Sequence, residues 1–452
     1  MRFDLPKGFW KSTALLALPI ALQNLLASCA SLIDTAMITP LGDTAVAAVG
    51  VAGRFTFLLN VVSFGFCSGG ATLISQFWGA GDKKGIHKTY GLSLTCSMLF
   101  ALVFALVLWL APDFCVSIFG PKPDVHAEAV VYTRILACAV PFIMYSQVTC
   151  AALRATEKVS VPFISSVASV VTNTFLNYCL ISGHFGFPAL GVKGAAIATV
   201  TGCVVQALIV FAFLYLGNNA VKCRISELFG QMTKAFAAKF FKTSFPVLLN
   251  ESMWAIGTNI EVMVLARQAT EEYAGYSVYE IIQGLLYVFF VGICHAAAIL
   301  IGKAVGRGDS DDAYKYAKAF FIMTPLIGFV LGAIFILVRE PILGIFEFGS
   351  ALSHDTASML LVVYGIWVGF RMIPYTAICG IFRAGGDTKT GCFIEIGALY
   401  IAAIPAVLVS GLVLHIPFVF LVAVMYFAED FTKGILCIKH FVSKKWIIKL
   451  TE

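Results

Sequence analysis

The stretch "FGFCSGGATLISQFWGAGD" (residues 64–82) recurs later in the chain as "VGICHAAAILIGKAVGRGD" (residues 291–309). The two copies align at a constant offset of 227 residues, and identical residues occupy the pairs Gly65/Gly292, Cys67/Cys294, Ala71/Ala298, Leu73/Leu300, Ile74/Ile301, Gly79/Gly306, Gly81/Gly308 and Asp82/Asp309. The same offset relates Pro19 to Pro246 and Asp34 to Glu261. A proline, a glycine cluster and an acidic residue that share one offset indicate an internal repeat.

The composition around this repeat is that of a membrane protein. Hydrophobic residues make up 60% of the 452 residues and charged residues only 12%, whereas soluble proteins carry about 25% charged residues. A spanning helix needs about 20 mostly apolar residues, and strand-like alternation is absent. The sequence therefore predicts an all-α integral membrane protein with twelve spans, at residues 12–38, 46–78, 89–111, 128–152, 161–183, 192–216, 243–266, 275–302, 316–338, 357–381, 392–413 and 416–438.

The repeat begins in the first and the seventh predicted span, so each half contains six helices that run in the same directions. We expect an N-terminal six-helix lobe (residues 1–216), a basic cytoplasmic linker (217–242) and a C-terminal six-helix lobe with a cytoplasmic tail (243–452). Two helical lobes related by a parallel repeat are typical of transporters that work by alternating access.

Basic residues predict the orientation. Most of the 31 Lys and Arg residues lie in the segments on the side of the N-terminus, and such segments face the cytoplasm in membrane proteins. Both termini are therefore expected in the cytoplasm. The net charge of +6 reflects this bias and does not indicate a nucleic-acid partner. The 13 cysteines contain no C-x-x-C pair, so they are interpreted as small apolar side chains.

"SLIDTAMI" (31–38) places Asp34 inside the first span. A charge at mid-bilayer costs about 2.5–3.5 kcal/mol on insertion scales, so such residues usually face the protein interior and have a function. Helical spacing puts Gln23 and Asp34 on one polar face. Asp34 is the predicted ion-coupling residue; the alternative is a structural ion pair with Arg54.

Further polar groups occur in other spans. Asn173 and Asn177 lie one helical turn apart in the fifth span, where their amides serve either function or interhelical packing. Glu251, Trp254 and Glu261 share a face of the seventh span and form a candidate cation or substrate site, in which Trp254 would stack on a cation; alternatively, Glu261 reaches water at the outer end. Internal ion pairing is expected for most of the remaining intramembrane charges, which are Glu280, Arg371, Glu395, Glu429, Asp430 and Lys433.

Pro19 and Pro246 lie inside the first and seventh spans. Each removes one backbone hydrogen bond and is predicted to kink its helix. Kinks at matching positions of the two halves suit helices that bend during transport.

Several motifs carry a family resemblance: "ISQFWGAGD" (74–82), "ALRATEK" (152–158), "NTFLNYCLI" (173–181), "GVKGAAIAT" (191–199) and "FRAGGDTK" (382–389). With "SLIDTAMI", they resemble a bacterial branch of the multidrug and toxic compound extrusion family, MATE. The resemblance implies twelve helices in two lobes in the inner (cytoplasmic) membrane. It also implies efflux of organic, often cationic, compounds against a proton or sodium gradient. Asp34 matches the acid on the family's first helix.

The resemblance also adds Thr199 and bears on the coupling ion. In one proton-linked branch the fifth helix carries an Asn and, four residues on, an acid. Asn173 matches the former, and Asn177 replaces the latter; the sixth-helix Thr of that branch matches Thr199. Gln23, Asn173, Asn177 and Thr199 are thus the expected polar cavity of the N-terminal lobe. In sodium-linked relatives acids on helices seven and ten bind the ion, but Arg371 occupies helix ten here, so that site is incomplete. Asp34, Asn173, Asn177 and Thr199 offer an alternative set of oxygen ligands for sodium; both ions stay open, and a proton is favoured.

These observations predict a secondary active multidrug exporter that exchanges a cation for an organic compound by alternating access. We expect small, cationic, amphipathic substrates, a monomer in the lipid bilayer, no cofactor besides H⁺ or Na⁺, and no catalytic or metal-ligating residues. Three alternatives stay open. One is a lipid-linked oligosaccharide flippase of the same superfamily; another is an intramembrane aspartyl protease, from the G-x-G-D motifs that end in Asp82 and Asp309; the third is a passive channel.

Overall fold

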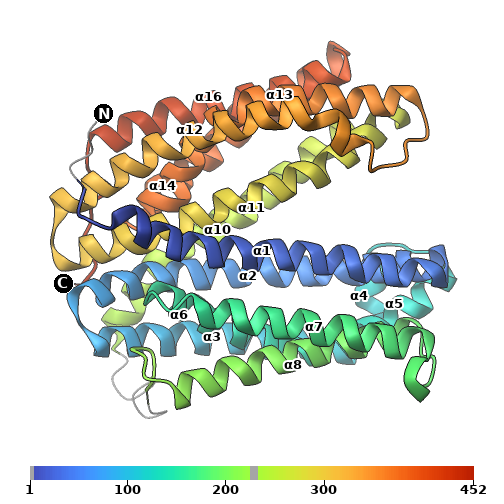
Figure 1. Ribbon diagram of the computed structural model, residues 1–452, viewed down its shortest axis with the longest axis horizontal. Helices are drawn as coiled ribbons and strands as arrows, with labels where there is room; N and C mark the ends of the chain where they lie inside the picture. The colour runs from blue at the N-terminus through green and yellow to red at the C-terminus, as the bar shows by residue number, and fades with distance from the viewer. Residues whose placement is uncertain (1–4, 224–232, 452) are drawn as a thin grey trace. The chain divides into compact units, whose positions relative to one another are not determined.

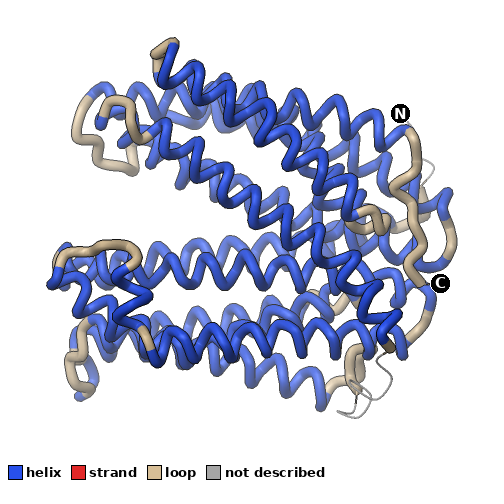
Figure 2. The backbone as a smooth tube through the Cα atoms, turned by 180° about the vertical axis from the view of Figure 1, so that it is seen from behind, coloured by secondary structure: helices blue, strands red, loops and turns tan. Residues whose placement is uncertain are grey.

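The structure is a computed structural model, and it describes residues 5–223 and 233–451. Within these ranges the chain is helical and contains no strand (Figures 1 and 2). The helices of the first half are α1 (Phe9–Ile38), α2 (Asp43–Ala80), α3 (Lys83–Leu110), α4 (Pro112–Ser117), α5 (Pro123–Leu136), α6 (Val140–Ala155), α7 (Ser160–Ser182) and α8 (Val192–Leu216). Those of the second half are α10 (Lys234–Leu265), α11 (Thr270–Arg307), α12 (Ser310–Leu343), α13 (Ala351–Tyr375), α14 (Thr388–Gly397), α15 (Ile404–Leu408) and α16 (Phe418–Val442).

The predicted all-α membrane fold is confirmed. Ten helical segments of the described chain are long and apolar enough to cross a membrane. The other two predicted spans correspond to α10, with 32 residues, and α16, with 25 residues. These two helices are long enough to span but carry several charged side chains, and these charges matter for the site described below.

Three predicted spans are interrupted helices. Residues 128–152 form α5 and α6, joined by a 3₁₀ turn (Ala137–Ala139) immediately before Pro141. After Pro374, α13 continues as a π-helical segment, Thr376–Phe382, and two more π-helical segments flank α15, which contains Pro405. A proline that cannot donate its backbone hydrogen bond accounts for these breaks. Pro19 and Pro246 lie inside the continuous helices α1 and α10.

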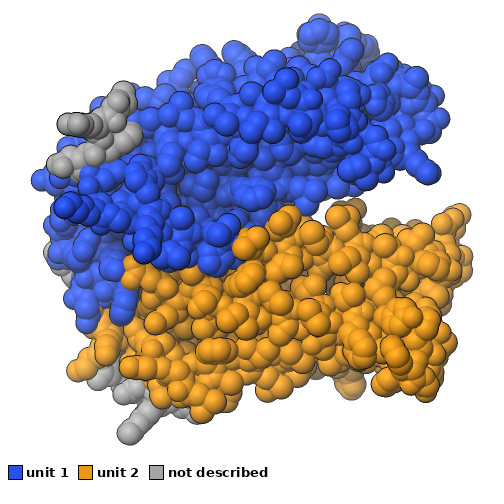
Figure 3. Space-filling model, in the orientation of Figure 1, with its two compact units in different colours: residues 1–21, 75–81, 242–452 blue, residues 22–74, 82–241 orange. Residues whose placement is uncertain are grey.

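The chain divides into two compact units (Figure 3). Unit 1 contains residues 1–21, 75–81 and 242–452, and unit 2 contains residues 22–74 and 82–241. Unit 1 has a buried core that includes Tyr279, Leu360 and Leu421, and unit 2 has its own buried clusters. The described residues 5–21 and 75–81 group with the second half because they pack against its helices.

A close helix crossing explains this grouping for the end of α2. A Cβ atom added to Gly79 would lie 2.0 Å from the carbonyl oxygen of Lys303, and one added to Gly306 would lie 1.9 Å from the carbonyl oxygen of Gln76. Gly79 matches Gly306 in the repeat, and Gln76 matches Lys303, so the two contacts are equivalent. The repeated glycines thus let the ends of α2 and α11 touch backbone to backbone around a local twofold axis.

The rest of the repeated motif ends one helix and starts the next. Gly81 and Gly308 have positive φ angles of 73° and 82°, which glycine adopts at low cost after a helix. Asp82 accepts a hydrogen bond from Gly85 N at 3.0 Å, and Asp309 accepts one from Asp312 N at 2.9 Å. Both aspartates of the G-x-G-D motifs are therefore helix N-caps.

Gly306→Ala is expected to destabilise the protein, because the new methyl group must push α2 and α11 apart. Overpacking of this kind costs about 1–3 kcal/mol. Gly284→Ala in the same helix is the matched control, since a Cβ atom there meets nothing within 4 Å and alanine is the better helix former. Thermal unfolding of both purified variants tests this; a Gly306→Ala protein as stable as the control would show that the crossing tolerates a side chain.

The chain after α16 docks on unit 1 as a C-terminal strap, residues 443–450. Trp446 is fully buried, and its indole Nε1 donates to the carbonyl oxygen of Phe441 at 3.1 Å. The Gln76 side chain donates from Nε2 to the carbonyl oxygen of Ile448 at 3.2 Å and accepts from Leu450 N at 2.7 Å. The strap therefore holds the end of α2, although its role was not predicted from the sequence.

Candidate functional site

A polar cluster in unit 2 surrounds Asp34. The half-buried Asp34 of α1 faces α7, where Asn177 Nδ2 donates to Asp34 Oδ1 at 2.7 Å. Asn173, one turn earlier in α7, donates from Nδ2 to Asp34 Oδ1 at 2.8 Å when its amide is oriented to satisfy both of its ends; Asn173 Oδ1 then accepts from Thr199 N of α8 at 3.3 Å. The structure thus brings Asp34, Asn173, Asn177 and Thr199 together, and it gives Asp34 amide partners instead of Arg54.

This geometry leaves two oxygen atoms of the cluster, Asp34 Oδ2 and Asn177 Oδ1, without a hydrogen-bond donor in the part of the chain that the structure describes. Both amide bonds end on Oδ1, so Oδ2 of Asp34 has no hydrogen-bond donor among the described residues. Asn177 is 1% exposed, and its Oδ1 is buried without a partner. Tyr132 of α5 lies beside Thr199 and within electrostatic reach of Asp34. Tyr132 was not predicted, because its position in the sequence does not indicate that α5 packs next to α8.

Gln23 lies on α1 but outside this cluster. Its Nε2 donates to Ser166 Oγ at 2.9 Å, and its Oε1 accepts from Arg154 Nη1 at 3.3 Å. Eleven residues separate Gln23 from Asp34, which corresponds to about 16 Å along a helix. The predicted polar cavity therefore consists of two separate groups in unit 2.

Unit 1 contains a buried ionic network that joins α13, α14 and α16. Lys433 Nζ donates to Glu429 at 2.6 Å and forms a second, short hydrogen bond to Glu395. Arg371 Nη1 lies 3.4 Å from Asp430 Oδ2 and 3.7 Å from Glu429. The predicted internal ion pairing is found here. Glu395 of α14 was among the residues expected to pair; the sequence did not predict that Trp367 Nε1 donates to Asp430 at 2.9 Å.

Glu261 of α10 adds a further carboxyl group to this network. It is 3% exposed and lies within electrostatic reach of Arg371, Glu429, Asp430 and Lys433. Glu261 is thus buried, which corrects the alternative that it reaches water at the outer end. Its Oε1 has no hydrogen-bond partner. Within the described residues, four carboxyl groups (Glu261, Glu395, Glu429 and Asp430) lie around Arg371 and Lys433. Arg383 also lies within electrostatic reach of Glu395 but is already paired with Glu251, so the network has more acids than bases.

Glu251 and Trp254 lie apart from Glu261. Glu251 Oε1 accepts from Arg383 Nη2 at 2.6 Å in an ion pair whose arginine side chain is 6% exposed. Trp254 is 38% exposed. Ten residues of helix place Glu251 about 15 Å from Glu261, so the structure does not bring the three residues of the predicted second-half site into one group.

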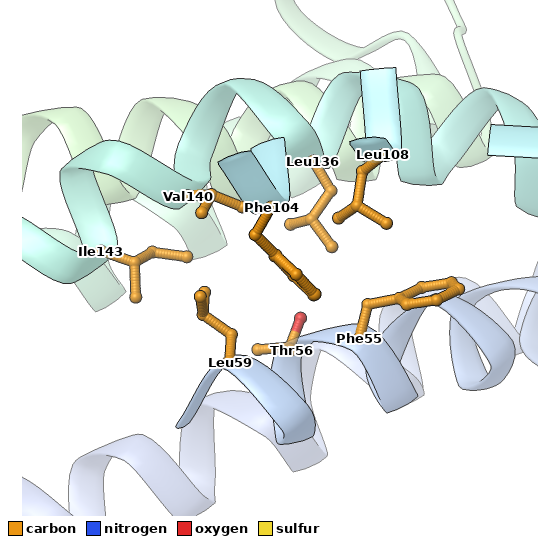
Figure 4. A pocket seen from close by; sticks show the side chains of 8 residues that line it. All are labelled: Phe55, Thr56, Leu59, Phe104, Leu108, Leu136, Val140 and Ile143. Atoms are coloured by element: carbon orange, nitrogen blue, oxygen red, sulfur yellow. The ribbon is translucent and has the colours of Figure 1, made fainter. Parts of the chain in front are cut away.

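A shallow apolar pocket with no enclosed room for a water molecule also lies in unit 2 (Figure 4). Phe104 of α3 points toward α2 across it, and Thr56 of α2 supplies one hydroxyl group. Ligand pockets usually enclose roughly 300–1,000 Å³. This pocket is therefore too small for a drug-sized molecule, and the polar groups above remain the candidate site.

Together, the helical fold, the parallel repeat and the buried charges define a polytopic membrane protein of the transporter class. The MatE family model matches residues 19–179 and 246–409, which is most of the chain. The chain therefore belongs to the MatE family.

Individual relatives are similar over most of their length. The chain is 24% identical over 402 residues to the "probable multidrug resistance protein YoeA" of Bacillus subtilis, covering 88% of this chain and 86% of the relative. It is also 24% identical over 399 residues to the "probable multidrug resistance protein NorM" of Thermotoga maritima. This match covers 87% of this chain and 84% of that relative.

Solved structures show the same fold. A crystal structure of a MATE protein in a bent conformation superposes with a TM-score of 0.84 at 18% identity, over 98% of this chain and 97% of that one. The eukaryotic MATE transporter AtDTX14 gives a TM-score of 0.84 at 19% identity, over 98% of both chains. These structural similarities support the twelve-helix architecture. Because the sequence identities are so low, the similarities show a common fold and nothing about function.

Proposed function

We propose that this protein is a secondary active exporter that moves small organic compounds out of the cell in exchange for protons, by alternating access. The observation that carries the proposal is the half-buried Asp34 carboxylate, held by amide groups of α7 inside a membrane helix bundle. Membership of the MatE family and the names of the multidrug resistance relatives support export of diverse compounds.

Asp34 is the proposed proton-coupling residue. When ionised, its Oδ1 accepts the amide hydrogens of Asn177 and Asn173. When protonated, it becomes a donor, and an asparagine amide that rotates can accept from it, because an amide carries both a donor and an acceptor. Sodium would instead require several oxygen ligands, whereas the asparagines direct N–H groups at the carboxylate. This polarity favours H⁺ as the coupling ion.

The proposed substrates are organic cations. The excess of carboxyl groups around Glu261 makes the interior of unit 1 attractive to a cation. Trp254, 38% exposed, offers an aromatic face for cation–π contact. Glu251 contributes less to this attraction, since Arg383 already neutralises it.

The proposed setting is the cytoplasmic membrane of a bacterium, with both termini in the cytoplasm. The distribution of Lys and Arg supports this orientation. We further propose a monomer that uses no cofactor besides the coupling ion and catalyses no covalent reaction.

Transport by the purified protein in liposomes tests this function. Vesicles are loaded with a fluorescent organic cation and diluted into acidic medium, and then into medium with a sodium gradient at equal pH. Protons entering the vesicles are expected to drive the dye out, and sodium alone is not. Release driven by sodium would reassign the coupling ion, and no release above empty vesicles under either gradient would overturn the exporter proposal.

A further inference from the structure

Each half carries an arginine in a similar short motif, and the two arginines have partners of different charge. The sequences "LRA" (153–155) and "FRA" (382–384) place Arg154 and Arg383 at the ends of corresponding helical segments. Arg383 Nη2 pairs with Glu251 of α10 at 2.6 Å. Arg154 Nη1 instead donates to the neutral amide oxygen of Gln23 on α1 at 3.3 Å. An arginine that has a carboxylate counter-ion in unit 1 thus has a neutral partner in unit 2.

Other donors gather beside Arg154. Ser166 Oγ of α7 accepts from Gln23 Nε2 at 2.9 Å and from Gln206 Nε2 of α8 at 3.3 Å. A hydroxyl group that accepts two hydrogen bonds still has its own hydrogen to donate, and a guanidinium group has five N–H donors. Among the described residues, Gln23 is the one side chain to which Arg154 donates.

The group is also accessible. Arg154, Gln23 and Gln206 are half-buried, and Ser166 is 9% exposed. An arginine in such surroundings binds an anionic group more strongly than one on an open surface, because it is less screened by solvent. Guanidinium groups match carboxylate and phosphate oxygens through paired N–H bonds.

We propose that Arg154, Ser166 and Gln206 form a binding site for an anionic oxygen group, a carboxylate or a phosphate. This goes beyond the proposed function, which concerns cations and the Asp34 cluster. The group can belong to a transported compound that carries a carboxylate or to a phospholipid head group. In both cases Arg154 supplies the charge, and the Ser166 hydroxyl and the free hydrogen of the Gln206 amide complete the donors.

Gln23→Glu is the decisive variant, because it gives Arg154 a carboxylate partner of the kind that Glu251 gives Arg383, although in the 227-residue repeat Glu251 itself corresponds to Asn24. The new carboxylate is expected to bind Arg154 and so to exclude an external anion while the arginine stays in place. Arg154→Gln removes the charge itself. Without ligand, Gln23→Glu should unfold at the same temperature as the wild type or a higher one, which separates loss of binding from loss of folding.

Thermal unfolding in neutral detergent at constant ionic strength provides the measurement, since a ligand that binds only the native state raises the unfolding temperature. The first probe is benzoate, with benzamide as the neutral isostere; the second is phosphatidylglycerol added to the micelles. We expect saturable stabilisation of the wild type by an anionic probe, no effect of benzamide, and binding about tenfold weaker or worse in both variants.

The two probes distinguish a transported carboxylate compound from a phospholipid head group as the ligand. A benzoate response lost in both variants supports a carboxylate site for transported compounds, and a response to phosphatidylglycerol alone, lost in the same way, supports a lipid phosphate site. A wild type that responds to neither anion, or a Gln23→Glu protein that responds like the wild type, overturns the proposal. Because binding is measured without a gradient, this outcome is independent of the liposome test.

Discussion

Asp34→Asn is expected to reduce proton-driven export of an organic cation to the level of empty liposomes. Asparagine keeps the shape of the side chain and can still bond with Asn177, but it cannot take up or release a proton. The variant is therefore expected to insert normally and to unfold at a temperature close to that of the wild type. Dye efflux from proteoliposomes under an imposed pH gradient measures the effect.

Asp43→Asn is the matched control for this variant. Asp43 is exposed in the first turn of α2, so its replacement removes one carboxylate without touching the cluster and should leave efflux unchanged. Proton-driven efflux that persists in Asp34→Asn at the wild-type rate would remove Asp34 from the coupling mechanism and direct attention to the carboxyl groups around Glu261.

Lys433→Met is expected to produce the largest loss of stability, about 3–5 kcal/mol in the free energy of unfolding. Lys433 donates to both Glu395 and Glu429, and removing one partner of a buried ion pair leaves an uncompensated charge. Here the substitution leaves Glu395 and Glu429 without their lysine partner. Unfolding of the purified protein in detergent, followed by its helical signal, measures the change.

Glu261→Gln is expected to change the stability in the opposite direction from Lys433→Met. It removes a carboxyl group from a network that already has more acids than bases, and its amide can donate to a neighbouring carboxylate. Its stability is expected to equal or exceed that of the wild type. If Glu261→Gln destabilised the protein as much as Lys433→Met, the carboxyl group of Glu261 would be an essential partner and not an excess charge.

Helical spacing predicted which residues share a face, but not their height along the helix or their neighbours. It grouped Asn173 with Asn177, and the structure places both beside Asp34. It also grouped Gln23 with Asp34 and Glu251 with Glu261, although each pair is separated by about three helical turns. Spacing along one helix therefore selected the polar faces correctly and overestimated the size of each site.

Partners from distant parts of the chain were beyond the reach of sequence reasoning. Glu395 meets Lys433 only because α14 packs against α16, and Arg383 meets Glu251 only because the segment after α13 returns to α10. Apolar run length predicted the spans well, since the bilayer sets that length. The breaks after Pro374 and around Pro405 changed the helix type within a span without changing its length.

The C-terminal strap has a consequence for biosynthesis. Proteins are made from the N-terminus, and early segments fold first. Gln76 therefore leaves the ribosome long before Ile448 and Leu450, the residues whose backbone groups bond its side chain. A translation product that stops before residue 448 lacks both bonds; Gln76 Nε2 keeps its bond to the carbonyl oxygen of Ala384 at 3.1 Å, but Oε1 loses its donor, and a buried acceptor without a donor costs about 1–3 kcal/mol. Residues made late in synthesis thus complete the hydrogen bonding of α2, a helix made early.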